Sequence, residues 1–148
     1  SPSTPPPSIK SLPLTVKYGK TGKQIKAGRY DWVNDSISPT NFPTDQTGEI
    51  EKEALLVLFN RSMESDEAER ELEALGLRPG NLDELLAVGK QHPDKQRSFL
   101  IVALGSAVRL VGGLFVPCLG GWGGGRELFL GGWGGGWDGV CRFLAFRK

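Results

Sequence analysis

The sequence has few of the residues from which metal sites and disulfide frameworks are built. Its 148 residues include two cysteines, Cys118 and Cys141, and one histidine, His92. Two cysteines cannot define a disulfide scaffold, and their spacing fits no zinc motif. Both lie in a segment rich in predicted strands, so one disulfide stays open as an alternative for an exported protein. We expect two unpaired thiols and no metal centre.

Catalytic constellations are missing as well. His92 ends a predicted helix and has no Ser or Cys nucleophile in a recognisable motif around it. Gly19-Lys20-Thr21 matches the end of a phosphate-binding loop, but the glycine required five positions before Gly19 is Leu14. No predicted helix follows the Gly-Gly-Gly runs, which excludes a dinucleotide-binding loop. We therefore expect a protein that is not an enzyme and that binds no cofactor.

Neither a strong charge of one sign nor a membrane-length apolar run is present. The formal net charge is +1, whereas binding to nucleic acid relies on clustered Lys and Arg. The uncharged stretch Leu110–Gly125 is interrupted by glycines and by Pro117, and it is too weakly apolar to span a bilayer. We expect no nucleic-acid partner and no transmembrane segment.

The chain has the length of one domain and a tail. Residues 1–13 are rich in Pro and Ser and predict an extended linker or disordered tail, which leaves residues 14–148 for a single domain. Glycine is unevenly distributed, because eight of the 21 glycines precede residue 106 and thirteen lie between Gly112 and Gly139. The composition therefore changes near Ser106.

Apolar periodicity predicts an α+β domain with several short strands and three helices. We expect strands at 14–18, 51–59, 99–104, 114–119, 126–130 and 140–147, and helices at 21–27, 65–75 and 81–91. Ser65 is the expected N-cap of the second helix, and Asn81 with Glu84 predicts a capping box at the start of the third. The strand at 99–104 should be central, and the last strand, apolar on both faces, should lie between two neighbours.

A repeated hexapeptide is the feature most relevant to function. Gly-Gly-Trp-Gly-Gly-Gly occurs at Gly120–Gly125 and again at Gly131–Gly136, on either side of Arg126–Leu130. Glycine supplies flexible backbone and tryptophan a large contact area, so the pattern predicts two adaptable loops that each present an aromatic side chain. The alternative is that Trp122 and Trp133 cover the sheet as core residues. We favour a recognition surface.

An ordered set of motifs in the C-terminal half resembles a known family. The set comprises Phe99–Ser106, Val116-Pro117-Cys118-Leu119, Arg126-x-Leu128-x-Leu130, Trp137-Asp138-Gly139 and Arg142–Lys148. It resembles the variable proteins of diversity-generating retroelements, notably those of bacterial and archaeal lineages with very small genomes. The resemblance covers roughly residues 55–148. The sequence departs from the family pattern at Ala107–Val111, and its segment between Leu119 and Arg126 is one residue shorter than in the family.

The resemblance implies a C-type lectin-like fold with mixed or antiparallel sheets and two flanking helices. In that fold the N-terminal strand pairs with the C-terminal strand, and the last third, here about residues 107–141, carries diversified side chains. The framework would comprise Leu119, Arg126, Leu128, Leu130, Trp137, Arg142 and Phe143. The variable, ligand-binding positions would be Phe115, Gly120, Gly121, Trp122, Glu127, Phe129, Gly131, Gly132, Trp133, Asp138, Val140 and Cys141.

The function expected from these features is ligand recognition or display. The partner would be a protein or another macromolecule, bound by a few aromatic anchors and without metal, because the C-terminal third lacks the acidic cluster of a calcium-dependent sugar site. We expect a monomer or a weak oligomer. The alternative function is single-stranded nucleic-acid binding, with bases stacked on the Gly/Trp loops. It is disfavoured by the absence of Lys and Arg between Leu110 and Gly125.

Overall fold

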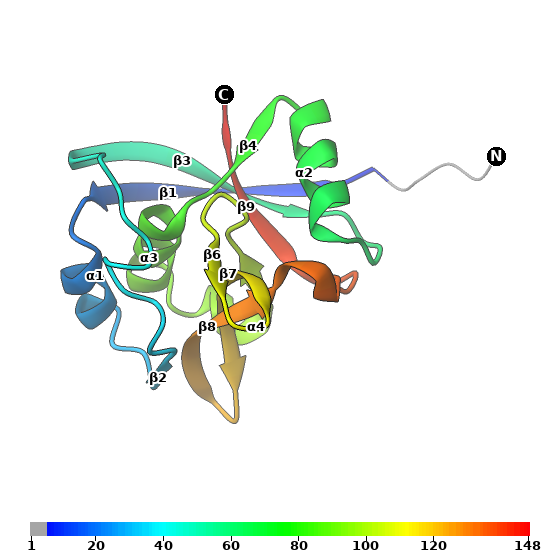
Figure 1. The fold of residues 1–148 in the computed structure, drawn as a ribbon. Coiled ribbons are helices and arrows are strands. Elements are labelled where there is room, and N and C mark those ends of the chain that lie inside the picture. Colours follow the sequence, from blue (N-terminus) through cyan, green and yellow to red (C-terminus); the bar gives the residue numbers. More distant parts are fainter. Residues whose placement is uncertain (1–5) are drawn as a thin grey trace.

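A computed structural model describes residues 6–148, and within this range nine strands form one mixed sheet (Figure 1). The elements in chain order are β1 (Ser8–Tyr18), α1 (Thr21–Ala27), β2 (Trp32–Val33), β3 (Gly48–Leu58), α2 (Ser65–Ala74), β4 (Leu77–Pro79), α3 (Leu82–Gln91), α4 (Lys95–Ser98), β5 (Ile101–Val102), β6 (Val108–Leu110), β7 (Gly113–Trp122), β8 (Gly125–Gly132), the short 3-10 helix η1 (Trp133–Gly135) and β9 (Arg142–Arg147). The α+β class expected from the sequence is confirmed.

The strand order is β1-β3-β9-β5-β7-β8-β2, with β4 added to β9 and β6 added to β7. The pairs β5–β9 and β2–β8 are parallel, and the other pairs are antiparallel. The expected pairing of the first strand with the last is wrong, because β3 lies between β1 and β9. Leu55–Val57 of β3 pair with Phe143–Ala145 of β9, while the whole of β3 pairs with β1.

The first strand begins earlier than the sequence predicts. The sequence predicts a tail over residues 1–13, yet Ser8–Pro13 belong to β1 and lie opposite Glu53–Leu58 of β3. The long apolar end of β3 explains the difference, since Leu12 is buried where it faces Ala54. Residues 1–5 of the predicted tail lie outside the described residues.

The predicted helices are confirmed within a residue or two, but only one of the two predicted caps is correct. The capping box is present, because the Asn81 side chain accepts from the Glu84 amide (3.0 Å) and the Glu84 carboxylate accepts from the Asn81 amide (2.9 Å). At α2 the N-cap is Glu64, and Ser65 is the first helical residue. The Ser65 hydroxyl is used elsewhere, as it donates to the carbonyl oxygen of Trp133 (2.8 Å).

The two faces of the sheet pack against different helices. In β9, Leu144 and Phe146 belong to the cluster that contains α3, whereas Phe143 and Ala145 belong to the cluster that contains α2. We call these the α3-side core and the α2-side core. β9 lies between β3 and β5, which confirms the prediction for the last strand, and β5 is central but shorter than expected.

A buried arginine, Arg126, connects β8 to three helical segments. Only 5% of Arg126 is exposed. Its guanidinium donates to the carbonyl oxygen of Gly28 after α1 (2.6 Å), to that of Gly89 in the last turn of α3, and to Oε1 of Gln96 in α4 (3.0 Å). It also stacks on the Tyr30 ring, 4.8 Å from the centroid. Carbonyl oxygens at helix C-termini carry partial negative charge, so they balance this cation without a carboxylate.

Replacing Arg126 by Lys keeps the charge but removes the planar fork that reaches several acceptors at once. We expect Arg126→Lys to lower the free energy of unfolding by about 2 kcal/mol, because buried carbonyl groups lose their donors. The control is Arg147→Lys, since Arg147 is exposed and pairs with Glu53 at the surface; it should change the value by less than about 0.5 kcal/mol. Urea unfolding followed by tryptophan fluorescence measures both, and equal losses would contradict the role of the fork.

A second buried ionic cluster holds the N-terminal end of α3. Glu84, which is fully buried, accepts from Tyr18 Oη (2.6 Å) and from both terminal nitrogens of Arg78 (3.0 and 2.7 Å), and Lys52 lies at 3.6 Å. Burial raises the pKa of the Glu84 carboxyl, but the hydrogen bonds from Arg78 and Tyr18 outweigh burial, so the pKa lies below its ordinary value. Because no solvent reaches the carboxylate, the cluster joins α3 to β1, β3 and β4 and offers no catalytic acid.

The lowered pKa of Glu84 predicts a pH dependence of stability. A carboxyl with a depressed folded-state pKa stabilises the fold above the ordinary unfolded-state pKa of about 4.3, and this contribution disappears as the pH falls through the lower folded-state value. We expect Glu84→Gln to flatten the decrease in unfolding free energy between neutral and acidic pH. Urea titrations at a series of pH values measure it, with Asp45→Asn, an exposed loop carboxylate, as control. If the unfolding free energy of Glu84→Gln fell with decreasing pH as steeply as that of the parent protein, Glu84 would not cause the pH dependence.

Candidate recognition surface

The first glycine-tryptophan hexapeptide forms the tip of a β-hairpin. Gly120–Trp122 end β7, Gly125 begins β8, and Trp122 pairs with Gly125 across a two-residue turn. Gly123 and Gly124 in that turn have φ values of +61° and +84°, which glycine adopts with less strain than other residues. The segment is therefore a hairpin and not the predicted loop. The predicted exposure of Trp122 is confirmed, since 81% of the residue is accessible to solvent.

The second hexapeptide is anchored to the start of α2. The prediction of an exposed loop is wrong for Trp133, which is half-buried in η1 and packs against the α2-side core. Its indole nitrogen donates to Asp66 Oδ1 (3.2 Å). The Ser65 hydroxyl donates to the Trp133 carbonyl and accepts from the indole nitrogen of Trp137 (2.9 Å). Trp137 is buried and meets Phe143 edge to face, which confirms its predicted place in the core. The two hexapeptides thus have different structures despite their identical sequences.

A groove runs between the hairpin and α4. Its volume is about 340 Å³, and we call it the hairpin groove; its lining is Gln96, Arg97, Ser98, Phe99, Leu100, Gly120, Gly121, Trp122, Glu127 and Phe129. Five of the predicted ligand-binding positions therefore meet at one place. Gln96, which is buried, fixes the groove by donating to the carbonyl oxygens of Gly120 and Glu127, both at 3.0 Å. The Arg97 guanidinium on the wall is paired with Asp94 (3.0 Å).

Three of the predicted variable glycines leave no room for a side chain. A Cβ atom on Gly120 would lie 2.9 Å from the Phe129 ring, and one on Gly131 would lie 2.6 Å from the Trp137 ring. At Gly121 the obstacle is the α4 backbone, at 2.9 Å from Arg97 Cα. By contrast, Gly134 has open space around the equivalent position. Gly120, Gly121 and Gly131 therefore permit close packing, and the side chains able to vary freely lie beside them.

These contacts predict that two alanine substitutions in the glycine repeats differ in how much they lower stability. We expect Gly121→Ala to lower the unfolding free energy by about 2 kcal/mol, because backbone atoms of α4 cannot move aside as a side chain can. Gly134→Ala should change it by no more than about 0.5 kcal/mol. Chemical unfolding of the two variants in parallel gives the comparison. Equal stability of the two would show that α4 does not hold the hairpin tip.

The remaining predicted ligand-binding positions are exposed or half-buried, apart from Cys141. Asp138 and Val140 are exposed, whereas Phe115, Glu127, Phe129, Gly132 and Trp133 are half-buried. The Phe129 side chain packs against the α2-side core, so this predicted ligand-binding position also contributes to the packing of the sheet. Asp138 lines a second groove of about 610 Å³ with Ser62, Met63, Glu64, Glu67, Gly135, Gly136 and Trp137.

Cys141 is not a surface residue, contrary to its place among the variable positions. It is 3% exposed, its thiol donates to Asp138 Oδ1 (3.4 Å), and burial raises its pKa to about 12. Cys118 is buried in the same α2-side core, and burial raises its pKa as well. Both cysteines are free thiols. Neither thiol is therefore exposed to a ligand, and burial keeps both thiols protonated.

Sequence reasoning missed the residues that complete the hairpin groove from outside the glycine-rich region. Gln96 and Arg97 belong to α4, a segment for which the sequence predicts no element, and Phe99 lies before β5 rather than in the predicted strand 99–104. The Arg142 guanidinium lies 4.2 Å from the centroid of the Phe99 ring, beside exposed Val140. The only available signal was the pattern of polar residues before Phe99, which is short and ambiguous between helix and loop.

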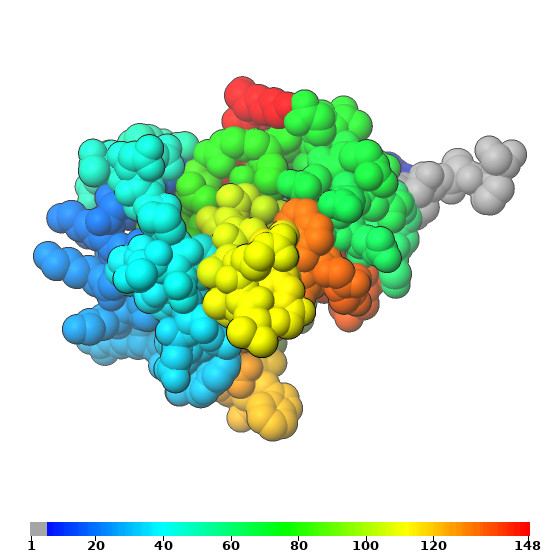
Figure 2. Space-filling view, in the orientation of Figure 1, coloured from blue at the N-terminus to red at the C-terminus, as the bar shows by residue number. Residues whose placement is uncertain are grey.

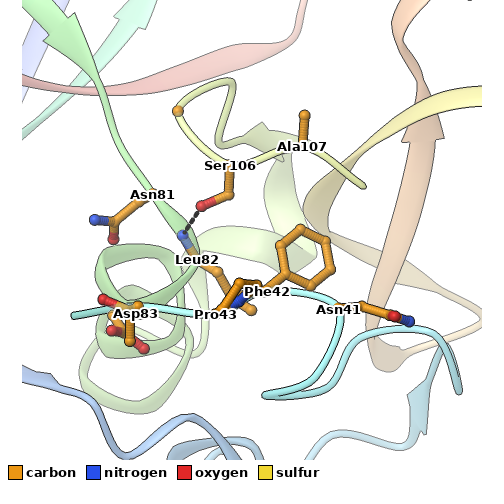
Figure 3. Close-up of a pocket in the computed structure, with 10 residues that line it drawn as sticks. Asn41, Phe42, Pro43, Asn81, Leu82, Asp83, Ser106 and Ala107 are labelled. Atoms are coloured by element: carbon orange, nitrogen blue, oxygen red, sulfur yellow. Dashed lines mark hydrogen bonds between the residues drawn. The ribbon is translucent and has the colours of Figure 1, made fainter. Parts of the chain in front are cut away.

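A third cavity lies at the N-terminal end of α3 (Figure 3). Its volume is about 360 Å³, and it is bounded by the loop 41–44, by Asn81–Asp83 and by 105–107. The Leu82 amide donates to Ser106 Oγ (2.8 Å), and the Asp83 carboxylate accepts from the Gly19 amide (3.2 Å) and Thr21 Oγ (3.1 Å). Because the helix-end donors have partners and a buried carboxylate lies next to them, this end of α3 does not suit an anion.

Other kinds of site find little support among residues 6–148. No group of three or more His, Cys, Asp or Glu side chains in this range is placed to hold a metal ion. The His92 Nε2 atom lies 2.7 Å from the carbonyl oxygen of Pro13 on β1, away from any nucleophile named above. None of the helices in the described range has the length and apolarity needed to cross a bilayer. Comparison of the chain with protein-family models, with curated proteins and with solved structures produced no match.

Proposed function

We propose that this protein is a recognition protein that binds a protein or another macromolecule through the hairpin groove and the side chains around it. The observation that carries the proposal is Trp122, an indole that is 81% exposed at the tip of a hairpin held in place from beneath. Rigid exposed aromatic residues are frequent anchors of interfaces. The groove beside Trp122 supplies the concave part of the surface.

Rigidity of the backbone supports the same proposal. Arg126 and Gln96 fix β8 and the end of β7 from the buried side, while Trp122, Asp138 and Val140 project to solvent. Ligand binding to a prearranged surface loses less conformational entropy than binding to flexible loops. We infer that side chains can change on this surface while its backbone stays in place.

The finer proposal is that the chain is a variable protein of a diversity-generating retroelement with a C-type lectin-like fold. In support, five of the seven framework positions are buried and the other two, Leu130 and Arg142, are half-buried; the buried ones are Leu119, Arg126, Leu128, Trp137 and Phe143. Two helices flank the sheet, as that fold requires, although β3 lies between the first strand and the last. The packed glycines and buried Cys141 restrict the diversified set to positions such as Trp122, Glu127, Asp138 and Val140. A neighbouring reverse-transcriptase gene, with a near-copy of the 3′ coding region that differs at adenines, would distinguish this origin from any other recognition protein.

A comparison of two display libraries tests the proposal. One library randomises the exposed positions Trp122, Asp138 and Val140, and the other randomises the buried positions Leu128, Trp137 and Phe143. We expect protease-resistant clones at about tenfold higher frequency in the first library, because surface substitutions usually change stability by less than about 0.5 kcal/mol and core substitutions by several. Clones that bind immobilised streptavidin should be selectable from the first library alone.

Two outcomes would contradict recognition of a macromolecular ligand by this surface. One is equal survival of the two libraries, which would mean that the surface is not a separate, replaceable layer. The other is tight, salt-sensitive binding of single-stranded oligothymidylate that is lost in Trp122→Ala and Trp133→Ala, which would favour the nucleic-acid function.

A further inference from the structure

A second exposed tryptophan, from outside the glycine-rich region, lies beside the hairpin. Trp32 in β2 is 50% exposed and pairs in parallel register with Glu127 of β8. Its neighbour Val33 pairs with buried Leu128 and packs on the α3-side core. Because successive side chains of a strand alternate between faces, Trp32 lies on the opposite face, together with Glu127.

Trp122 lies on that same face of the sheet. It is directly opposite Gly125, and Gly125 precedes Glu127 by two positions along β8. The Trp32, Glu127 and Trp122 side chains therefore form one surface patch across three adjacent strands, which we call the indole–carboxylate patch. In Figure 2 the gold hairpin tip projects at the lower end of the molecule, with the light-blue segment that contains β2 next to it.

The space between the two indoles carries negative charge. Gly125 has no side chain here, and Asp31 Oδ2 lies 3.2 Å from where a Cβ of Gly125 would be. This oxygen accepts from the Arg126 backbone amide (2.7 Å), which holds the Asp31 carboxylate in place beside β8 and leaves its other oxygen without a hydrogen-bond partner in the described part of the chain. Among residues 6–148, neither Asp31 nor Glu127 forms an ion pair. Two arginines of the neighbouring segments have other partners, since Arg97 is paired with Asp94 and the Arg126 guanidinium is buried on the other face.

We propose that the indole–carboxylate patch binds a basic side chain, the guanidinium or ammonium group of an arginine or lysine on a partner protein. Indole rings attract cations placed over their faces, and the two carboxylates supply the opposite charge. An anionic ligand would meet repulsion at the same place. This inference rests on the proposed recognition function and specifies the chemistry of its partner, with Trp32 as an aromatic wall from outside the glycine-rich region.

The test is an NMR titration of the full chain with N-acetyl-arginine amide, followed through the four tryptophan indole N–H signals. N-acetyl-citrulline amide, in which a neutral urea replaces the guanidinium, is the matched control ligand. We expect the arginine compound to shift two of the four signals, those lost in Trp32→Ala and Trp122→Ala, and the citrulline compound to leave them nearly unchanged. The signals of Trp133 and Trp137, whose indole nitrogens donate to Asp66 and Ser65, serve as internal references.

The Glu127→Gln variant isolates the contribution of charge. Glu127→Gln should lower the affinity for the arginine compound about threefold or more, whereas Asp45→Asn should leave that affinity unchanged. Added salt should lower the affinity of the parent protein for the same compound. Equal shifts with both compounds, shifts confined to the reference signals, or unchanged binding in Glu127→Gln would overturn the inference. Each of these results leaves the two-library comparison unaffected, so failure of this inference is distinguishable from failure of the recognition function.

Discussion

The position of the proposed recognition surface depends on the buried guanidinium of Arg126. It lies beneath the strand that carries Glu127 and reaches the ends of α1 and α3 and the side chain of Gln96. Gln96 in turn holds the carbonyl oxygens of the two strands at the base of the hairpin. Elements that are distant in sequence thus share one set of hydrogen bonds, and the hairpin tip cannot tilt without breaking several of them.

Helix α3 has a buried charged side chain at each end, and each charge has the sign that the helix dipole favours there. The Glu84 carboxylate lies in the first turn of α3, where free amides carry partial positive charge, and the Arg126 guanidinium lies at the last turn, against the carbonyl oxygen of Gly89. The two charges are satisfied differently, because Glu84 has cationic partners and Arg126 has carbonyl groups. In both cases the buried charge connects strands to α3, so the sheet and the helix are ordered as one unit.

Features set by neighbouring residues could be predicted from the sequence, and features set by distant contacts could not. The Asn81 capping box and the doubly apolar last strand follow from local patterns, and both are present. The insertion of β3 between the first and last strands, the early start of β1 and the burial of Cys141 depend on pairing across the chain. The glycines were the most misleading residues, because Gly121 suggests flexibility in sequence but permits the close approach of α4 in the structure.

For the candidate surface, the sequence located the groove through Trp122 and Phe129 but not the walls that complete it. Trp32 and Phe99 come from segments with no glycine-tryptophan repeat, and only the sheet order brings them beside Glu127 and Arg142. If the C-terminal third is diversified as proposed, changes at Trp122 and Glu127 occur next to a constant indole and a constant phenyl ring. Constant aromatic walls would supply a general apolar contribution to affinity, and the replaceable side chains between them would set which partner is bound.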